Sequence, residues 1–159
     1  MSVKTYEPHK SSIGSLDANI AALLVYVISA IVSFIPYVQF AAFVVPIIFL
    51  YQEKSSELVR FHARQALALY LVTSIISIIM NIIMWVSVAS FVAAPTLENA
   101  LGAYGALASL WWISFIVGIV GLIILIFAIL AMVNAYKYKE YSIPFFGDLG
   151  QKLAGKIGM

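Results

Sequence analysis

His62 and its neighbours are the residues of this sequence whose types could perform chemistry. Arg60 and Arg64 flank this histidine and Glu57 precedes it, so it could act as a base or contribute to a metal site. A metal site needs three or four ligands, however, and only Glu57 and Gln65 lie near His62 in the sequence. The flanking cations also favour a neutral imidazole. We therefore expect a histidine on the helix surface, at the lipid headgroups, that is hydrogen-bonded to a neighbouring segment.

Other catalytic arrangements are missing from the sequence. It has no cysteine, which excludes thiol catalysis, disulfides and cysteine-ligated zinc or iron–sulfur clusters. It also has no Ser-His-Asp arrangement, glycine-rich phosphate loop, HExxH motif or pair of intramembrane carboxylates. We therefore expect a protein that is not an enzyme and that binds no cofactor, no metal and no nucleic acid.

Long apolar segments must position these residues. Of the 159 residues, 64% are apolar and 10% are charged, against about 45–50% and about 25% in an ordinary soluble domain. Residues 18–52, 65–97 and 99–136 include no Asp, Glu, Lys or Arg. About 20 apolar residues suffice to cross the ~30 Å hydrocarbon core of a bilayer. The composition therefore excludes a water-soluble globule and predicts an integral membrane protein.

Helix breakers and capping residues divide these stretches into four expected helices, over residues 18–34, 36–51, 57–91 and 96–136. Pro36 interrupts the first stretch, and Pro46 can kink the second helix. Asp17, the pair Ser55-Ser56 and Thr96 can act as N-caps. The fold class is thus all-α, an integral membrane four-helix bundle over 18–136 with interfacial helical extensions. The first two helices are slightly short for the bilayer, which leaves two, three or four full crossings open.

The charges predict an orientation. All nine basic residues lie on one side of the expected membrane, in 1–17, 52–64 and 137–159, whereas the opposite loops carry only Glu98. The positive-inside rule then places the N-terminal tail and the C-terminal segment in the cytoplasm. We expect a multi-pass protein of the cell membrane.

The C-terminal segment can form a short basic helix. Asp148 can cap it, with Leu149, Leu153 and Ile157 on one face and lysines beside them. Its three glycines weaken helix formation, so an unstructured basic tail is the alternative.

Two stripes at helical spacing mark surfaces for packing. The small residues of the last helix are Ser114, Gly118, Gly121 and Ala128, and the polar residues of the third are Tyr70, Ser74, Ser77 and Asn81. Small residues let helices approach closely in lipid, within the bundle or, as the alternative, between copies. Polar groups in hydrocarbon form interhelical hydrogen bonds or line a neutral wet pathway.

Two segments resemble a known family. The residues Val59-Arg60-Phe61-His62-Ala63-Arg64-Gln65-Ala66 are similar to the V-R-F-H-A-x-Q-A signature of small prokaryotic membrane proteins related to the chloroplast Tic-twenty import component. The segment 135–148, with Pro144, Gly147 and Asp148, resembles their closing A-x-x-G-x-x-Y-x-I-P-x-x-G-D pattern, with Tyr138 where glycine is common. The resemblance spans about residues 17–155.

The resemblance implies four transmembrane helices and no settled activity. The chloroplast member is regarded as a core part of a protein import complex, and magnetosome MamF-type relatives influence mineral particle growth. The loop with Gly102, Tyr104 and Gly105 has no acidic mineral-binding cluster, so nothing in the sequence favours the magnetosome role.

We expect a packing or scaffold protein, an accessory subunit that associates with lipids and with other membrane subunits or itself. A neutral-lined channel or transport component using the Tyr70 to Asn81 face is the alternative, and a sensor of anionic lipid surfaces is a weaker one.

The Arg, Phe, His and Gln residues of the first motif lie at the expected membrane boundary. We expect Arg60, Phe61, His62 and Gln65 to dock the start of the third helix on the 143–148 turn, with Arg60 or Arg64 paired to Asp148.

Overall fold

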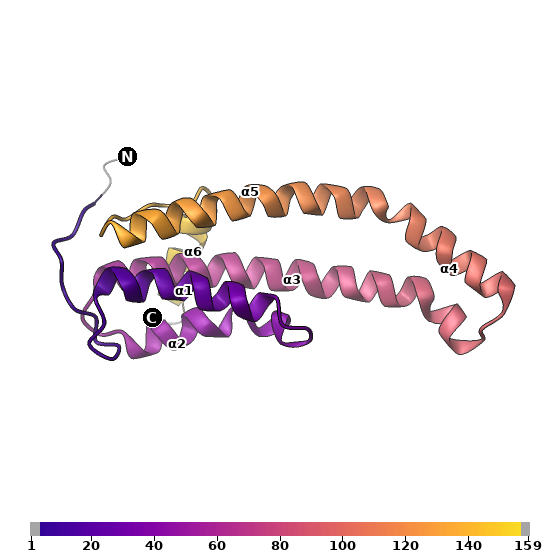
Figure 1. Ribbon diagram of the computed structural model, residues 1–159, viewed down its shortest axis with the longest axis horizontal. Coiled ribbons are helices and arrows are strands. Elements are labelled where there is room, and N and C mark those ends of the chain that lie inside the picture. Colours follow the sequence, from indigo (N-terminus) through magenta and orange to yellow (C-terminus); the bar gives the residue numbers. More distant parts are fainter. Residues whose placement is uncertain (1–3, 157–159) are drawn as a thin grey trace. The chain divides into compact units, whose positions relative to one another are not determined.

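The computed structural model describes residues 4–156, and its named elements in that range are all helices. They are α1 (Ala18–Ser33), the 3-10 helix η1 (Val38–Ala41), α2 (Val44–Gln52), α3 (Glu57–Ala93), α4 (Leu97–Ser109), α5 (Trp111–Tyr136) and α6 (Phe146–Lys156) (Figure 1). The all-α prediction is confirmed. The chain forms two compact units: one holds the chain up to Ile75 and from Ile126 onward, and the other is Ile76–Leu125.

Two helical stretches are long and apolar enough to cross a membrane, Glu57–Ala93 and Leu97–Tyr136. At about 1.5 Å per residue, the 37 residues of α3 extend over about 55 Å, well beyond the ~30 Å hydrocarbon core. The apolar helices Ala18–Ser33 and Val38–Gln52 are shorter. The sequence and these helices support a membrane protein, with two of its helices sufficient for full crossings.

The helix expected over residues 36–51 is replaced by a turn, η1 and the nine-residue α2. Pro36 breaks the chain as expected, and Tyr37 after it takes a left-handed backbone conformation with φ of 66°, which no continuous helix accommodates. The expected kink at Pro46 does not follow, because Pro46 is the third residue of α2. In the first turn of a helix the amide that proline lacks has no intrahelical partner.

The helix expected over 96–136 is also divided, at Leu110. Thr96 caps α4 as predicted, since its side chain accepts a hydrogen bond from the Asn99 amide at 3.2 Å. At the other end of α4, the Ser109 hydroxyl donates to the Ala106 carbonyl at 2.7 Å, and the Leu110 amide donates to the Leu107 carbonyl, three residues back, at 3.1 Å. Both bonds compete with the regular helical ladder and separate α4 from α5.

The other two capping predictions have different outcomes. Ser56 caps α3, because the Val59 amide donates to its hydroxyl at 3.3 Å. Asp17 occupies the N-cap position of α1 but makes no capping bond, because its carboxylate pairs with Lys10 at 2.8 Å.

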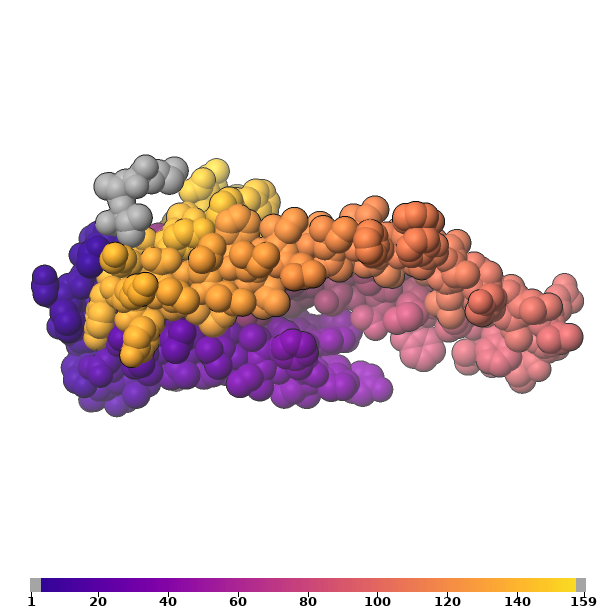
Figure 2. Space-filling view, turned by 45° about the horizontal axis from the view of Figure 1, so that its top comes forward, coloured from indigo at the N-terminus to yellow at the C-terminus, as the bar shows by residue number. Residues whose placement is uncertain are grey.

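Small side chains dominate the buried helix faces of the first unit. They are Ala18, Ala21 and Ala22 of α1, Ala63, Ala66 and Ala68 of α3, Ala128, Ala131 and Ala135 of α5, and Gly147, Gly150 and Ala154 of α6. Such residues bring helix backbones close together. In Figure 2 the indigo N-terminal segment and the yellow-orange end of α5 cover the same end of this unit.

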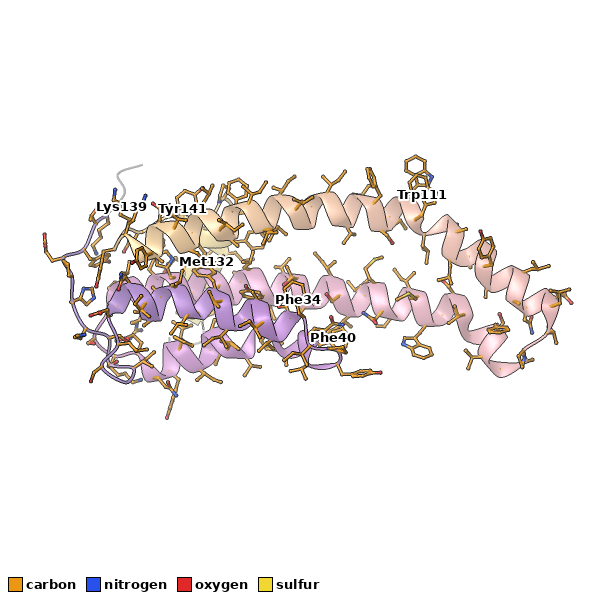
Figure 3. The ribbon with its side chains drawn as sticks, viewed as in Figure 1. Phe34, Phe40, Trp111, Met132, Lys139 and Tyr141 are labelled. Carbon is orange, nitrogen blue, oxygen red and sulfur yellow. The ribbon has the colours of Figure 1, made fainter. Side chains whose placement is uncertain are left out.

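The small-residue stripe on α5 is buried at one end and exposed at the other. Ala128 is buried within the first unit, where it packs against other residues of that unit. Ser114, Gly118 and Gly121 are exposed in the second unit, and a Cβ atom added to either glycine would meet nothing within 4 Å. The Trp111 side chain, at the start of the same helix, projects outward from the α5 ribbon (Figure 3), with its ring beside that of Trp112.

Candidate functional site

Three polar side chains form a fully buried cluster in the first unit, which we call the polar core: Tyr26, His62 and Gln65. Tyr26 comes from α1, and the other two lie one turn apart on α3. The Gln65 Nε2 donates to the Tyr26 hydroxyl at 2.8 Å, and this hydroxyl lies 3.2 Å from His62 Nδ1. His62 was expected on the helix surface, and that expectation is wrong because α1 covers its face of α3.

The polar core also binds the backbone between α5 and α6. His62 Nε2 lies 3.1 Å from the Lys139 carbonyl oxygen. Gln65 Nε2 donates to the Tyr141 carbonyl at 3.2 Å, and Gln65 Oε1 accepts from the Ile143 amide at 2.7 Å. The expected docking of the first motif on the second is therefore present. It is made by side chains to backbone, because a segment without regular structure leaves its amides and carbonyls free for such bonds.

The hydrogen-bond partners of its two ring nitrogens indicate that the His62 imidazole is neutral. The Lys139 carbonyl can only accept, so His62 Nε2 carries a proton and donates to it. The Tyr26 hydroxyl accepts from Gln65 and can then donate its own proton to an unprotonated Nδ1. Every donor and acceptor in this chain of bonds is satisfied in that arrangement. The cluster is therefore built to hold three segments together, because its N–H and O–H donors are all bonded within the protein.

Among the described residues, neither arginine of the motif forms the expected ion pair with Asp148. Arg64 forms an ion pair with Glu57 at 2.8 Å and a weaker bond to Gln151 of α6 at 3.3 Å. Glu57 lies two turns before Arg64 on the same face of α3, so this pair needs no rearrangement of the backbone. Arg60 Nε is buried without a hydrogen-bond partner in the described part of the chain.

Phe61 lies in the first motif and Asp148 in the second. Phe61 is half-buried, with its ring edge-to-face against the His62 imidazole at 5.3 Å between centroids. Asp148 was expected as the N-cap of the last helix, which is wrong because α6 begins at Phe146. It instead places a negative charge in the first turn, where it complements the helix dipole.

The glycines of the last helix form its contact surface. A Cβ atom at Gly150 would lie 2.6 Å from the Arg64 carbonyl carbon and 2.9 Å from the Gln65 amide nitrogen. A Cβ atom at Gly147 would lie 3.1 Å from Gln65 Oε1 and would collide with the Ser142 hydroxyl. The buried face thus runs over the glycines, whereas Leu149 and Leu153 are only partly buried and Ile157 lies outside the described residues.

The turn before α6 brings this glycine face onto α3. Pro144 ends the extended segment, and Phe145 takes a left-handed conformation with φ of 69°. The Gly147 amide closes the turn by donating to the Ile143 carbonyl at 2.8 Å. The same residue, Ile143, therefore binds the polar core with its amide and the start of α6 with its carbonyl.

A second polar cluster surrounds the carboxylate of Glu53, which is fully buried between α2 and α3. We call it the serine cage, because its donors come from Ser11, Ser12, Ser55 and Ser56. Sequence reasoning missed it. Ser55 and Ser56 are adjacent in the chain, but Ser11 and Ser12 lie about forty residues away and carry no local signal of this pairing.

The serine cage ties the N-terminal segment to the helical unit, so residues 4–17 are not a free tail. The same segment makes further backbone bonds to the linker after α5, where the Tyr6 amide donates to the Tyr138 carbonyl and the Glu140 amide donates to the Lys4 carbonyl, both at 2.9 Å. His9 Nε2 lies 2.8 Å from the Ser56 hydroxyl. Three segments distant in sequence are therefore joined in the first unit: the N-terminal segment, the residues between α2 and α3, and the linker after α5.

Glu53 is expected to stabilise the fold in a pH-dependent way. Burial raises the pKa of its carboxyl, but the bonds from the Ser11 hydroxyl, the Ser56 and Ser55 amides and the Ser12 hydroxyl outweigh burial and lower it from 4.5 to about 2. A lowered pKa means that this stabilisation is complete above pH 4.5 and is lost as the pH falls toward 2.

The test is Glu53→Gln, which we expect to lower the free energy of unfolding by about 2 kcal/mol at neutral pH. The difference from the wild type should shrink between pH 4.5 and 2 in thermal unfolding followed by circular dichroism. Glu7→Gln, at an exposed glutamate, is the matched control and should have little effect. A difference that stays constant over this pH range would contradict the assignment.

The polar residues along the stripe of α3 differ in their hydrogen-bond partners. The Tyr70 hydroxyl donates to the Tyr26 carbonyl of α1 at 2.9 Å, which is the expected interhelical bond. Asn81 donates to the Ser77 carbonyl of its own helix at 2.9 Å. The Ser74 hydroxyl is buried and has no partner in the described part of the chain.

Among the described residues, no group of three or more His, Cys, Asp or Glu side chains could hold a metal ion.

A comparison with family models matches residues 17–149 to the MamF/MmsF family, described as the magnetosome magnetite crystal formation protein family. This match includes both motifs and confirms the MamF-related part of the resemblance, whereas a relation to the Tic-twenty component is not shown. Comparisons with curated proteins and with solved structures found no match.

Proposed function

The chain belongs to the magnetosome magnetite crystal formation protein family, and from this premise we propose that it is a non-enzymatic scaffold or accessory subunit of the membrane in which such crystals form. In this role it acts by packing with copies of itself or with other membrane proteins. The proposal concerns the membrane side of crystal formation and assigns no mineral-binding residues to the chain.

The single observation that carries the proposal is how the polar groups of both motifs are used. His62 and Gln65 are the motif side chains best suited to bind a ligand or transfer a proton. Both form their hydrogen bonds to Tyr26 and to the backbone after α5. A site for substrate needs polar groups that are free to meet it. The arrangement is that of a structural joint, which supports a role in assembly.

The outer surface supports association with lipid and with other helices. Large apolar side chains on α5 are about half exposed, among them Phe115, Ile116, Leu122 and Leu125. Lipid tails satisfy such a surface, and small residues beside them allow a second helix to approach. The open positions at Gly118 and Gly121 are therefore the proposed contact between copies or subunits.

We further propose a multi-pass topology with both termini in the cytoplasm. In this topology α3 and α5 cross the bilayer, and α1 with α2 forms a short hairpin that contributes the remaining membrane segments. The support is the sidedness of the basic residues, all of which lie outside 65–136. Fusing a reporter to either terminus should give the cytoplasmic signal, and an external signal from either one would contradict the topology.

Association is tested by extracting the protein from native membranes in a mild detergent and measuring its mass in solution. We expect an oligomer or a complex with other membrane proteins. Gly118→Leu should shift the protein toward the monomer, while Ile119→Leu, on an adjacent exposed position, should not. A wild-type protein that elutes alone as a strict monomer would contradict the proposed role.

A further inference from the structure

We propose that the groove between α1 and α5 binds one acyl chain of an anionic phospholipid, with Lys137 holding the phosphate of its headgroup. The groove lies within the first unit and has a volume of about 310 Å³. It is lined by Leu23 of α1, by Ile129, Met132, Val133 and Tyr136 of α5, and by Lys137 directly after α5. This inference rests on the proposed topology, in which the end of α5 reaches the cytoplasmic leaflet.

The lining residues of α5 follow one face of the helix. They recur at intervals of three, one, three and one residues from Ile129 to Lys137, which is helical spacing. Eight residues of helix span about 12 Å along the axis. Met132, near the middle of this face, lies on the side of α5 toward α1 (Figure 3).

The lining of the groove is apolar along its whole length, made by Leu23, Ile129, Met132, Val133 and the carbon atoms of Tyr136 and Lys137. Tyr136 is the last residue of α5, and Lys137, which is exposed and carries the positive charge, directly follows it. A phospholipid has the same order, from acyl chain through the interfacial region to phosphate. Tyrosine is enriched at that interfacial level, and lysine extends its ammonium to the headgroups.

Lys137 is available for a phosphate. It is exposed and, among the described residues, takes part in neither of the two ion pairs, which are Lys10 with Asp17 and Arg64 with Glu57. The mouth of the groove is also fixed in place, because Asn19 Nδ2 of α1 donates to the Tyr136 carbonyl at 3.0 Å. A defined gap with an unpaired cation at its rim favours an anionic lipid over a zwitterionic one.

Lipid retention tests the proposal. The full-length protein is purified in mild detergent, incorporated into nanodiscs of equal parts phosphatidylglycerol and phosphatidylcholine, re-extracted, and its bound lipids are counted by native mass spectrometry. We expect the wild type to retain phosphatidylglycerol preferentially. Lys137→Gln should reduce the preference about fivefold, the effect expected of one lysine near an anionic surface. Lys152→Gln, on α6 outside the groove, is the matched control and should leave the preference unchanged.

A second pair of variants tests the apolar part of the groove. Met132→Trp fills it and should reduce retention of both lipids, whereas Leu130→Trp adds the same ring at an exposed α5 position outside the lining and should not. Equal retention of the two lipids by the wild type, or an unchanged preference in Lys137→Gln, would overturn the proposal. So would a Met132→Trp protein that changes its oligomeric state while its bound lipids stay the same, because the groove would then hold a protein partner.

The outcomes also separate this inference from the proposed function. A protein that remains in its complex but shows no lipid preference overturns only the lipid site. A strict monomer that retains phosphatidylglycerol overturns only the scaffold role.

Discussion

Gly150→Ala is expected to release α6 from the base of α3. The added methyl carbon would lie 2.6 Å from the Arg64 carbonyl carbon and 2.9 Å from the Gln65 amide nitrogen, well inside van der Waals contact. Both atoms belong to the hydrogen-bonded backbone about two turns into α3, so they cannot rotate away as the end of a flexible side chain would. Overpacking against such a wall costs roughly 3 kcal/mol, and the cheapest relief is for α6 to leave its site.

Gly155→Ala is the matched control for this prediction. Gly155 lies on the same helix, and a Cβ atom there would meet nothing within 4 Å. Alanine favours a helix over glycine by about 1 kcal/mol, so this control should leave α6 docked and slightly more helical. Hydrogen exchange of residues 146–156 and limited proteolysis in detergent measure the release. Equal protection of α6 in Gly150→Ala and in the wild type would show that the close approach to α3 is not real.

Gln65→Leu is expected to have the largest effect of any substitution in the polar core. Leucine is close in volume to glutamine, so the change removes hydrogen bonds more than packing. It leaves the Ile143 amide and the Tyr141 carbonyl without their partner and deprives the Tyr26 hydroxyl of a donor. Each buried polar group left unsatisfied costs about 1–3 kcal/mol, so we expect a loss of roughly 4 kcal/mol in the free energy of unfolding.

Thermal unfolding followed by circular dichroism in micelles measures this loss. Gln52→Leu is the matched control, because it makes the same substitution at an exposed glutamine at the end of α2. Release of the linker should also expose residues 139–143 to hydrogen exchange in Gln65→Leu alone. A variant as stable as Gln52→Leu would remove Gln65 from the role of joint between α3 and that linker.

Both predictions concern the same contact region, where α3 meets α6 and the linker before it. The first motif supplies a buried amide and imidazole on α3, and the second supplies the backbone that they bind and Gly147, with Gly150 just after it. The two sequence motifs are therefore two halves of one joint. A rigid joint of this kind holds the ends of the helices in place, which is what a scaffold in a membrane requires.

Much of the helical plan could be predicted from local chemistry. Thr96 and Ser56 are N-caps in the sequence and in the structure, and Pro36 ends the first helix region, because a cap or a proline acts on the backbone within a few residues. The division at Leu110 was not predicted. It depends on which carbonyl the Ser109 hydroxyl binds, and a serine inside an apolar run leaves that choice open.

The sequence by itself determined the apolar character and the all-helical class, which follow from composition, helical period and residue type. It also predicted that the two motifs approach each other, but not which bonds join them. Only the tertiary structure decided that Glu53 sits among four serines, that α1 buries His62, that Arg64 pairs with Glu57, and that α6 contacts α3 through glycines. The physical reason is that such partners lie tens of residues apart, and nothing local selects one distant donor over another until the helices have packed.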